Sequence, residues 1–337
     1  MSDLHVKEAG VEDAAVICNV IRTAFAARPR VDPPTAALDE SVGSVAAAIE
    51  RDGGLVCTVD GIPAGALLFA DEGNGALALR RVAAVPHFQA RGVASAVVGV
   101  AEEVAANRGY DDVVLRARSE LPATVTFWMR RGYVEVGRDG TSLTLAKALP
   151  IELVTRSAHD TQAVGESIAA LAQRGDVVLL TGELGAGKTT LTQGIATGLR
   201  VRGNATSPTF VISRVHPSLV GGPALVHVDA YRLGGTLELD DLDLDGALDD
   251  SVTVVEWGEG IAEGLSANLL RVQIARLRGG DDVSTTPWGM PATAATHAAD
   301  AQAAADLRTI TVTPSGARWV GSGVRSHLTA PVRQTTA

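Results

Sequence analysis

One short run of residues combines the groups that phosphate chemistry needs. The stretch GELGAGKTT, residues 182–190, matches the pattern G-x-x-x-x-G-K-[S/T] in full, after an apolar run (DVVLLT) and before a helical one. Its glycines allow backbone N–H groups to curl around a phosphate, Lys188 supplies a positive charge, and the Thr189 hydroxyl can ligate Mg²⁺. The pattern predicts a nucleoside triphosphate site. Its contacts are expected at Glu183, Leu184, Gly185, Ala186, Gly187, Lys188, Thr189 and Thr190.

Four more residues, later in the chain, add to this prediction. Thr209 lies in a Thr/Ser-Pro loop (ATSPTF) where a γ-phosphate sensor would lie, and Asp229 ends one apolar strand. Glu256 ends another apolar strand, where a carboxylate can bind Mg²⁺ or its water, and Trp257 follows it. Taken singly, each position also fits a turn or a strand-end cap. Together, in this order, they predict one site, at which Thr189 and Glu256 could bind Mg²⁺ or its water.

These motifs resemble the TsaE family, the small ATPases of bacterial tRNA threonylcarbamoyladenosine synthesis. The matching segments are GELGAGKTT, SPTF, HVDAYRL and VEW, within residues 151–277 and 307–320. The resemblance implies that Thr189 and Glu256 hold Mg²⁺ and that the loop 183–190 holds ATP. It also implies that Lys188, Asp229 and Glu256 are the catalytic residues, with Asp229 acting in hydrolysis. It places Thr209 in a switch-like loop and Trp257 beside the nucleotide or a partner. It also implies assembly with TsaB and TsaD, which would make the contact with tRNA, and ATP hydrolysis that resets their complex.

The chain departs from this family at two places. Gly258 stands where proline often follows V-E-W. The segment 278–306, rich in Ala, Thr, Gly and Asp, interrupts the turn that usually carries an arginine on the nucleotide side, and we expect it to be a mobile insertion. Neither Arg278 nor Arg308 can be assigned to that role from the sequence, so the adenine contacts stay open.

A second anion site is predicted far from the first. The stretch VAAVPHFQARGVASAVV fits Q/R-x-x-G-x-G/A between a strand and a long helix, which presents backbone N–H groups of residues 91–95 to a pyrophosphate. Residues 3–149 resemble the GNAT family of acetyl-CoA-dependent N-acetyltransferases. The resemblance implies a splayed strand at 82–85 that pairs with the pantetheine arm of acetyl-CoA. The expected contacts are Val82, Val85, Gln89, Arg91, Gly92, Val93, Ala94 and Ser95.

The acid of an acetyltransferase is missing from its usual place. In FWMRRGY, Trp128 stands where many GNAT members carry the tyrosine that protonates the leaving thiolate, and an indole N–H cannot do that at neutral pH. Tyr133 is expected to serve in packing. Glu120 or a chain of waters could act as the general base. The acetyl acceptor is therefore open, and a degenerate CoA-binding regulatory module remains an alternative.

The surrounding elements predict two α/β domains. A GNAT mixed-sheet domain is expected over residues 1–149, with a hairpin turn at Asp60-Gly61, and a P-loop NTPase sandwich domain over 151–320. RTITVTP (308–314) is expected to pair with LLRVQIA (269–275), and Ser157 to cap a helix. Residues 321–337 are expected to be a disordered tail.

Composition limits the class of protein. The chain has 337 residues, 46% of them hydrophobic and 20% charged, with a net charge of −10. Acidic residues outnumber basic ones in both halves, which disfavours tight nucleic-acid binding by the chain itself. No apolar run is long enough for a membrane span, and the N-terminus is too polar for a signal peptide, so a cytoplasmic protein is expected. Cys18 and Cys57 are expected to be buried hydrophobes.

Two rival functions remain open. A small-molecule kinase could use the same loop, but it needs an acceptor pocket and an arginine-bearing lid, and neither is visible in the sequence. A nucleotide- and CoA-responsive scaffold would need no chemistry, and Trp128 keeps that alternative open for the first half.

Overall fold

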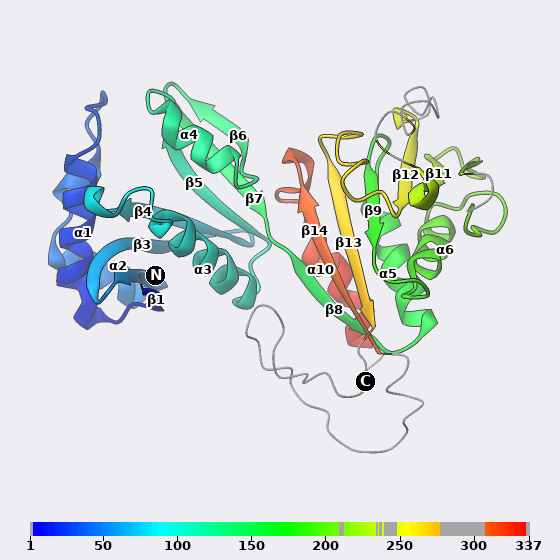
Figure 1. Cartoon of the computed structure of the whole chain (residues 1–337), viewed down its shortest axis with the longest axis horizontal. Helices are drawn as coiled ribbons and strands as arrows, with labels where there is room; N and C mark the ends of the chain where they lie inside the picture. The colour runs from blue at the N-terminus through cyan, green and yellow to red at the C-terminus, as the bar shows by residue number, and fades with distance from the viewer. Residues whose placement is uncertain are drawn as a thin grey trace, which may run out of the picture. The chain divides into compact units, whose positions relative to one another are not determined.

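The computed structural model describes residues 3–208, 212–233, 235, 238, 248–276 and 307–334, the last five without their side chains. The chain divides into two compact units, residues 1–149 and 150–337, and each is described by itself (Figure 1). Thr209, most of the acidic run 237–250 and the segment 278–306 lie outside the described residues. Among the helices that are described, none is long and apolar enough to cross a membrane.

The first unit is built on a seven-stranded mixed sheet with the order β1-β2-β3-β4-β5-β7-β6. Its strands are β1 (Leu4–Glu8), β2 (Gly54–Val59), β3 (Ile62–Gly73), β4 (Ala76–Ala84), β5 (Asp112–Arg118), β6 (Val134–Asp139) and β7 (Ser142–Ala148). The predicted hairpin is present between β2 and β3, because Asp60 and Gly61 both take the positive φ of a type I′ turn. All neighbours are antiparallel except β4 and β5.

Helices cover both faces of this sheet. They are α1 (Ala14–Ala26), α2 (Val42–Asp52), α3 (Val93–Asn107) and α4 (Pro122–Met129). Alternate strand residues point to opposite faces, so Val56 and Ala66 pack with α1 and α2, while Leu55 and Leu67 pack with α3 and α4. Each face of the sheet therefore has its own apolar cluster.

The second unit carries a seven-stranded sheet with the order β10-β11-β12-β9-β13-β14-β8. Its strands are β8 (Ile151–Thr155), β9 (Val177–Thr181), β10 (Ser213–His216), β11 (Ala224–Asp229), β12 (Ser251–Glu256), β13 (Leu269–Arg276) and β14 (Arg308–Ser315). The four central strands are parallel, and their near-continuous apolar sequences follow from burial on both faces. The predicted antiparallel pairing of β13 with β14 is present, with Arg276 opposite Arg308.

Helices α5 (Ala158–Leu171) and α6 (Lys188–Gly198) pack against each other beside this sheet. Ser157 caps α5 as predicted, because its hydroxyl accepts the N–H of Asp160 at 3.0 Å. The other face of the sheet packs its apolar side chains against the segment after β12, through Ala262 and Leu265.

The prediction of a disordered tail over 321–337 is wrong for most of its length. Helix α10 spans Val324–Gln334 and contacts α5 and β8. Val324 and Leu328 lie one helical turn apart and are buried, and the Arg325 guanidinium donates to the carbonyl of Pro150 at 2.9 Å. Two apolar residues at the right spacing are enough to dock a polar helix.

Candidate functional site

Three strand ends meet at one edge of the second sheet. Strands β11, β12 and β9 are parallel neighbours, and their register sets Asp229 beside Glu256 and Glu256 beside Leu180. The loop 182–187 leaves β9 at this edge and leads into α6. Because carboxyl ends of parallel strands share an edge, the fold brings together predicted site residues that are up to 74 positions apart in the sequence.

The phosphate-binding loop folds tightly around its own lysine. Gly182 takes a φ of 140°, and a side chain there would collide with the carbonyl of Ile274, so only glycine fits. Lys188 begins α6 and is 5% exposed. Its ammonium donates to the carbonyls of Gly182 at 2.8 Å and Glu183 at 3.0 Å, and lies 3.7 Å from the ring centre of Trp257. Burial lowers the pKa of Lys188, and the carboxylates of Glu256 and Asp229 oppose that shift.

The tip of the loop is open to solvent. Leu184 is 88% exposed, Gly185 is exposed, and Ala186 is buried and donates its N–H to the carbonyl of Glu183 at 3.1 Å. Thr190 is partly buried in the first turn of α6. The first N–H groups of a helix have no partner within it, so α6 presents donors to a phosphate together with Lys188.

Thr189 and Glu256 form the pair that was predicted to hold a metal. The Thr189 hydroxyl donates to the Glu256 carboxylate, with its oxygen 3.2 Å from Oε1 and 3.4 Å from Oε2. Glu256 is 3% exposed. A hydroxyl and a carboxylate are hard oxygen ligands, and Mg²⁺ takes one or two such groups together with nucleotide phosphates. The described residues contain no cluster of three or more His, Cys, Asp and Glu that could hold a metal.

Asp229 is held in place by its neighbours. It is 5% exposed, and its carboxylate accepts the Ser207 hydroxyl at 3.0 Å and the Tyr231 N–H at 3.1 Å. The second contact caps the short helix Ala230–Arg232 that follows β11. Ser207 belongs to the same loop as Thr209, so the loop of the expected switch reaches Asp229 although Thr209 itself is outside the described residues.

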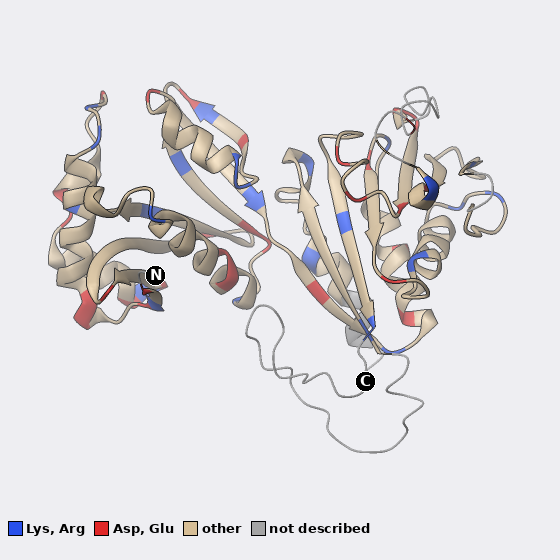
Figure 2. Cartoon of the chain, viewed as in Figure 1, with Lys and Arg blue, Asp and Glu red and all other residues tan. Residues whose placement is uncertain are grey.

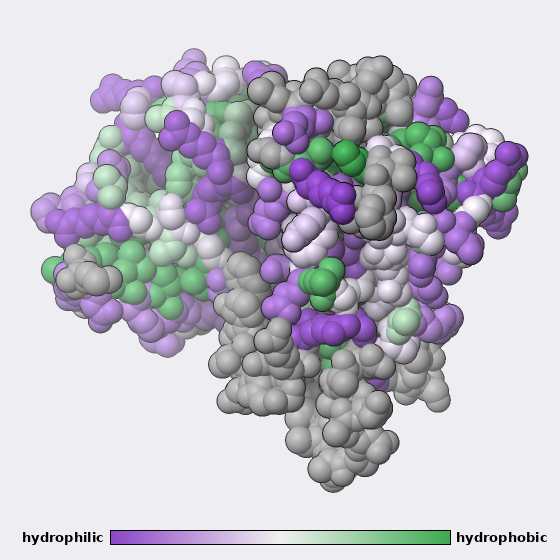
Figure 3. Space-filling model, turned by 45° about the vertical axis from the view of Figure 1, so that its right-hand side comes forward, coloured by the Kyte–Doolittle hydropathy of each residue, from purple (hydrophilic) through white to green (hydrophobic). Residues whose placement is uncertain are grey.

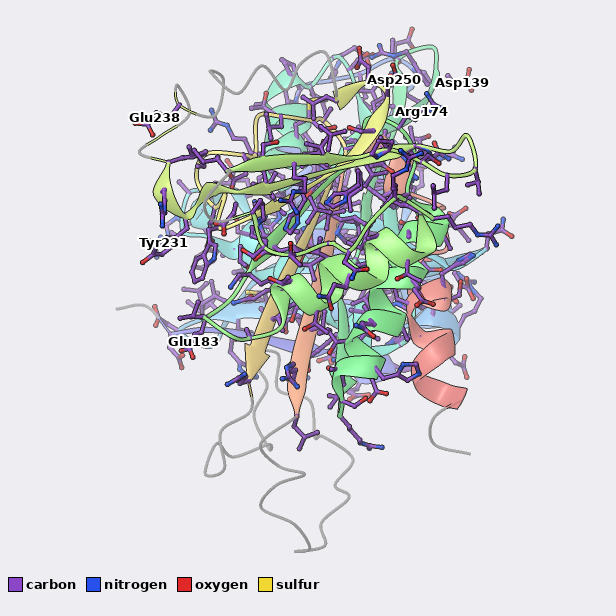
Figure 4. All side chains as sticks on the ribbon, turned by 90° about the vertical axis from the view of Figure 1, so that its right-hand side faces the viewer. Asp139, Arg174, Glu183, Tyr231, Glu238 and Asp250 are labelled. Atoms are coloured by element: carbon purple, nitrogen blue, oxygen red, sulfur yellow. The ribbon has the colours of Figure 1, made fainter. Side chains whose placement is uncertain are left out.

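Trp257 lines a pocket together with residues of the phosphate-binding loop. Its φ of 62° turns the chain directly after Glu256, and its ring meets that of Tyr231 edge to face at 5.4 Å. A pocket of about 260 Å³ is lined by Thr181, Gly182, Glu183, Trp257 and Glu259. Figure 4 shows Glu183 and Tyr231 toward the same edge of the view.

One group at the site was not found from the sequence, and another was named but not assigned. His227 lies two residues before Asp229 on β11, and its Nε2 is 3.0 Å from Glu256 Oε1. The Arg308 guanidinium donates to the carbonyl of Ala186 at 2.9 Å, inside the phosphate-binding loop. The alternation of strand side chains could have placed His227 on the same face as Asp229, but only the pairing of β11 with β12 shows what it contacts.

A family model described as threonylcarbamoyl adenosine biosynthesis protein TsaE matches residues 155–281. A Streptomyces coelicolor protein named tRNA threonylcarbamoyladenosine biosynthesis protein TsaE is 51% identical over 162 residues, which cover 48% of this chain and 95% of that protein. The chain belongs to the TsaE family. A Mycobacterium tuberculosis protein of the same name is 50% identical over 139 residues, which cover 39% of this chain and 83% of that protein.

The first unit of the chain matches a different family model. The acetyltransferase (GNAT) family model matches residues 21–133, so a GNAT-family domain precedes the TsaE domain. The crystal structure of the PaiA N-acetyltransferase from Thermoplasma acidophilum in complex with coenzyme A is 16% identical, covers 43% of this chain and 99% of that chain, and has a TM-score of 0.39.

In the GNAT domain, β4 and β5 separate as the resemblance implied. They are paired only from Ala76 to Ala78 and from Asp112 to Val114, and the rest of each strand diverges (Figure 1). A bulge in β4 at Arg81 and Val82 accompanies the divergence. The strand ends at Ala84, one residue before the predicted limit, and Val85 donates its N–H to Ala64.

The predicted pyrophosphate loop has one difference from expectation. Gly92 takes a φ of 81° and caps α3, which begins at the buried Val93, and Gln89, Arg91 and Ser95 are exposed while Ala94 is partly buried. The Arg91 N–H donates to the carbonyl of Phe88 at 3.3 Å, so it is not available to a ligand in this conformation. The donors without helical partners lie in the first turn of α3 instead.

The candidate acid and base positions of this domain are both occupied by other contacts. Trp128 and Tyr133 are 4% and 2% exposed, and their rings pack edge to face at 4.9 Å. Burial and the Glu102 carboxylate raise the pKa of Tyr133 well above its usual value. Hydrogen bonds from Arg118 lower the pKa of Glu120 to about 2, so this guanidinium holds the carboxylate that was considered as the general base.

Proposed function

We propose that the TsaE domain hydrolyses Mg·ATP to drive tRNA threonylcarbamoyladenosine synthesis together with TsaB and TsaD counterparts. The observation that carries the proposal is the meeting of Lys188, Thr189, Asp229 and Glu256 at one edge of the sheet, beside the loop 183–190. The biosynthetic role comes from the names of the relatives, which this chain matches over most of their length.

Each residue has a role that its surroundings support. Lys188 would leave the carbonyls of Gly182 and Glu183 to neutralise the β- and γ-phosphates. Thr189 and Glu256 would hold Mg²⁺, which supplies charge neutralisation on the phosphates when bound. Asp229, fixed through both carboxylate oxygens, would orient the attacking water or the metal's water.

The surface of the domain fits a role that depends on partners. Lys and Arg are interspersed with Asp and Glu along the ribbon in Figure 2, which supports leaving the contact with tRNA to partner proteins. Apolar atoms reach the surface in separate patches on the face of Figure 3. At the site, Leu184 and Tyr231 are 88% and 67% exposed, and a docked partner could bury them and close the loop around the nucleotide.

The test is ATP hydrolysis by the full chain, with and without purified TsaB, TsaD and tRNA. Lys188→Ala should abolish hydrolysis and the stimulation by partners, whereas Arg174→Ala, in a surface ion pair with Asp250, should leave both intact. In cells whose only copy of the protein carries Lys188→Ala, tRNA that is still modified would refute the proposal. Phosphate transfer to a small molecule without partners would favour the kinase alternative.

For the first domain we infer binding of acetyl-CoA, supported by the divergence of β4 from β5 and by the free first turn of α3. Transfer of the acetyl group to an amine is the further step that the family implies. Trp128 stands in the place of the usual tyrosine acid and is buried, so a CoA-responsive module without transfer stays the second candidate. Calorimetric titration with acetyl-CoA tests whether the domain binds CoA at all. A screen of acetyl acceptors then distinguishes an active acetyltransferase from a module that binds CoA without transfer.

A further inference from the structure

His227 is the most completely enclosed polar group beside the predicted metal ligands. It lies inside β11 with 0% of its surface exposed. Its Nε2 is 3.0 Å from Glu256 Oε1, and its Nδ1 is buried with no hydrogen-bond partner in the described part of the chain. Within the described part of the chain, the contact with Glu256 is therefore the one hydrogen bond that this buried ring makes.

The contact fixes the tautomer of the ring. An ionised carboxylate only accepts hydrogen bonds, so Nε2 carries a proton and donates it to Glu256. Nδ1 has no acceptor in the described part of the chain, so the one hydrogen bond of the ring is made by Nε2, in a direction set by the strand that holds it.

The Glu256 carboxylate has two hydrogen-bonding neighbours, Thr189 and His227. Thr189 lies 3.2 and 3.4 Å from the two oxygens of Glu256, on α6, whereas His227 reaches Oε1 from β11. Without His227, the Glu256 side chain could rotate away from the direction of Thr189. Such outer contacts orient the groups that hold a metal.

We propose that His227 is a positioning residue, whose Nε2–H holds Glu256 Oε1 so that the carboxylate faces the Mg²⁺ of the bound nucleotide. The inference rests on the proposed function of the TsaE domain and adds to it a residue that touches neither nucleotide nor metal. It requires that His227 affects the metal dependence of the site and not the affinity for nucleotide alone.

The chain offers a matched control. His216 lies on the neighbouring strand β10, is 4% exposed, and has one ring nitrogen at 3.2 Å from the carbonyl of Arg202 and the other without a partner in the described residues. It is as buried as His227 but its contact is to a backbone carbonyl. Replacing it should cost stability without touching the metal.

The experiment measures binding of a fluorescent ATP analogue to the full chain over a Mg²⁺ titration and in EDTA, with thermal unfolding recorded for each variant. His227→Leu should raise the Mg²⁺ concentration at half-saturation about 10-fold or more and leave binding in EDTA unchanged. His227→Gln, whose amide reaches as far as Nε2, should recover most of the loss. His227→Asn, whose amide is too short, should not. His216→Leu should keep the wild-type Mg²⁺ dependence.

Two results would overturn the inference. One is a folded His227→Leu or His227→Asn protein with the Mg²⁺ dependence of the wild type. The other is a loss that is equal in EDTA and in Mg²⁺, or equal for Gln and Asn, because either would mean a structural role alone. If the wild-type protein binds the analogue without any response to Mg²⁺, the proposed function itself fails, which is a distinct outcome.

Discussion

The hydroxyl of Thr189 and the carboxylate of Glu256 lie within 3.4 Å of each other although 67 residues separate them. Thr189 is the second residue of α6 and Glu256 the last of β12. The parallel pairing of β12 with β9 creates this contact, because the loop that follows β9 returns α6 across the end of β12. The pair joins the phosphate-binding loop to the strand whose carboxylate would hold the metal.

Glu256→Gln should separate nucleotide binding from hydrolysis. The amide keeps the size of the side chain and its contact with Thr189 but removes the charge that attracts Mg²⁺, so ATP hydrolysis should fall at least about 100-fold. Binding of ATP in EDTA should change little. Steady-state hydrolysis and equilibrium binding measure the two effects, with Glu166→Gln on the exposed side of α5 as the control. Full hydrolysis by Glu256→Gln would exclude this carboxylate as a ligand.

Asp229→Asn should lower the rate of hydrolysis and spare the affinity for Mg·ATP. Its carboxylate is already fixed by Ser207 and Tyr231, and the amide can keep one of these contacts, so the fold should survive. Loss of the charge that orients water should reduce kcat roughly 100-fold with a small change in KM. Single-turnover hydrolysis in the presence of the partners measures the chemical step. A change confined to KM would place Asp229 in nucleotide binding instead.

Features that depend on neighbouring residues could be predicted from the sequence, and features that depend on contacts distant in the sequence could not. The loop 182–190 and the turn at Asp60-Gly61 depend on neighbouring residues, and both were predictable. His227 was missed because its partner Glu256 is 29 positions away, and only the strand register brings them together. Helix α10 was mistaken for a tail because its polar sequence hides two apolar residues that dock on α5 and β8. Long-range pairing, which sequence periodicity does not encode, decides such cases.

Gly92→Ala should weaken the binding of acetyl-CoA by the GNAT domain. A side chain at Gly92 would meet nothing within 4 Å, so the effect comes from the backbone, whose φ of 81° costs an alanine about 1 kcal/mol. Relaxation of that strain would turn the first N–H groups of α3 away from the pyrophosphate. Gly140→Ala is a matched control, because Gly140 has a φ of 56° and equally free space in the turn between β6 and β7. Calorimetry should show reduced affinity for Gly92→Ala alone, and equal affinities would argue against this loop as the pyrophosphate site.

Glu120→Gln should change the acid stability of the first domain and not its chemistry. The pKa of Glu120 is lowered from 4.5 to about 2 by the hydrogen bonds from Arg118, so the charged pair stabilises the folded state above pH 4.5. That stabilisation is lost as the pH falls from 4.5 toward 2, because the unfolded state binds the proton first. Wild type should therefore exceed Glu120→Gln in the free energy of unfolding at pH 7, and the difference should vanish toward pH 2. Urea unfolding across this range measures it, and where acetyl transfer is found, its pH profile should be the same for both proteins. A profile that loses its acidic limb in Glu120→Gln would restore Glu120 as the general base.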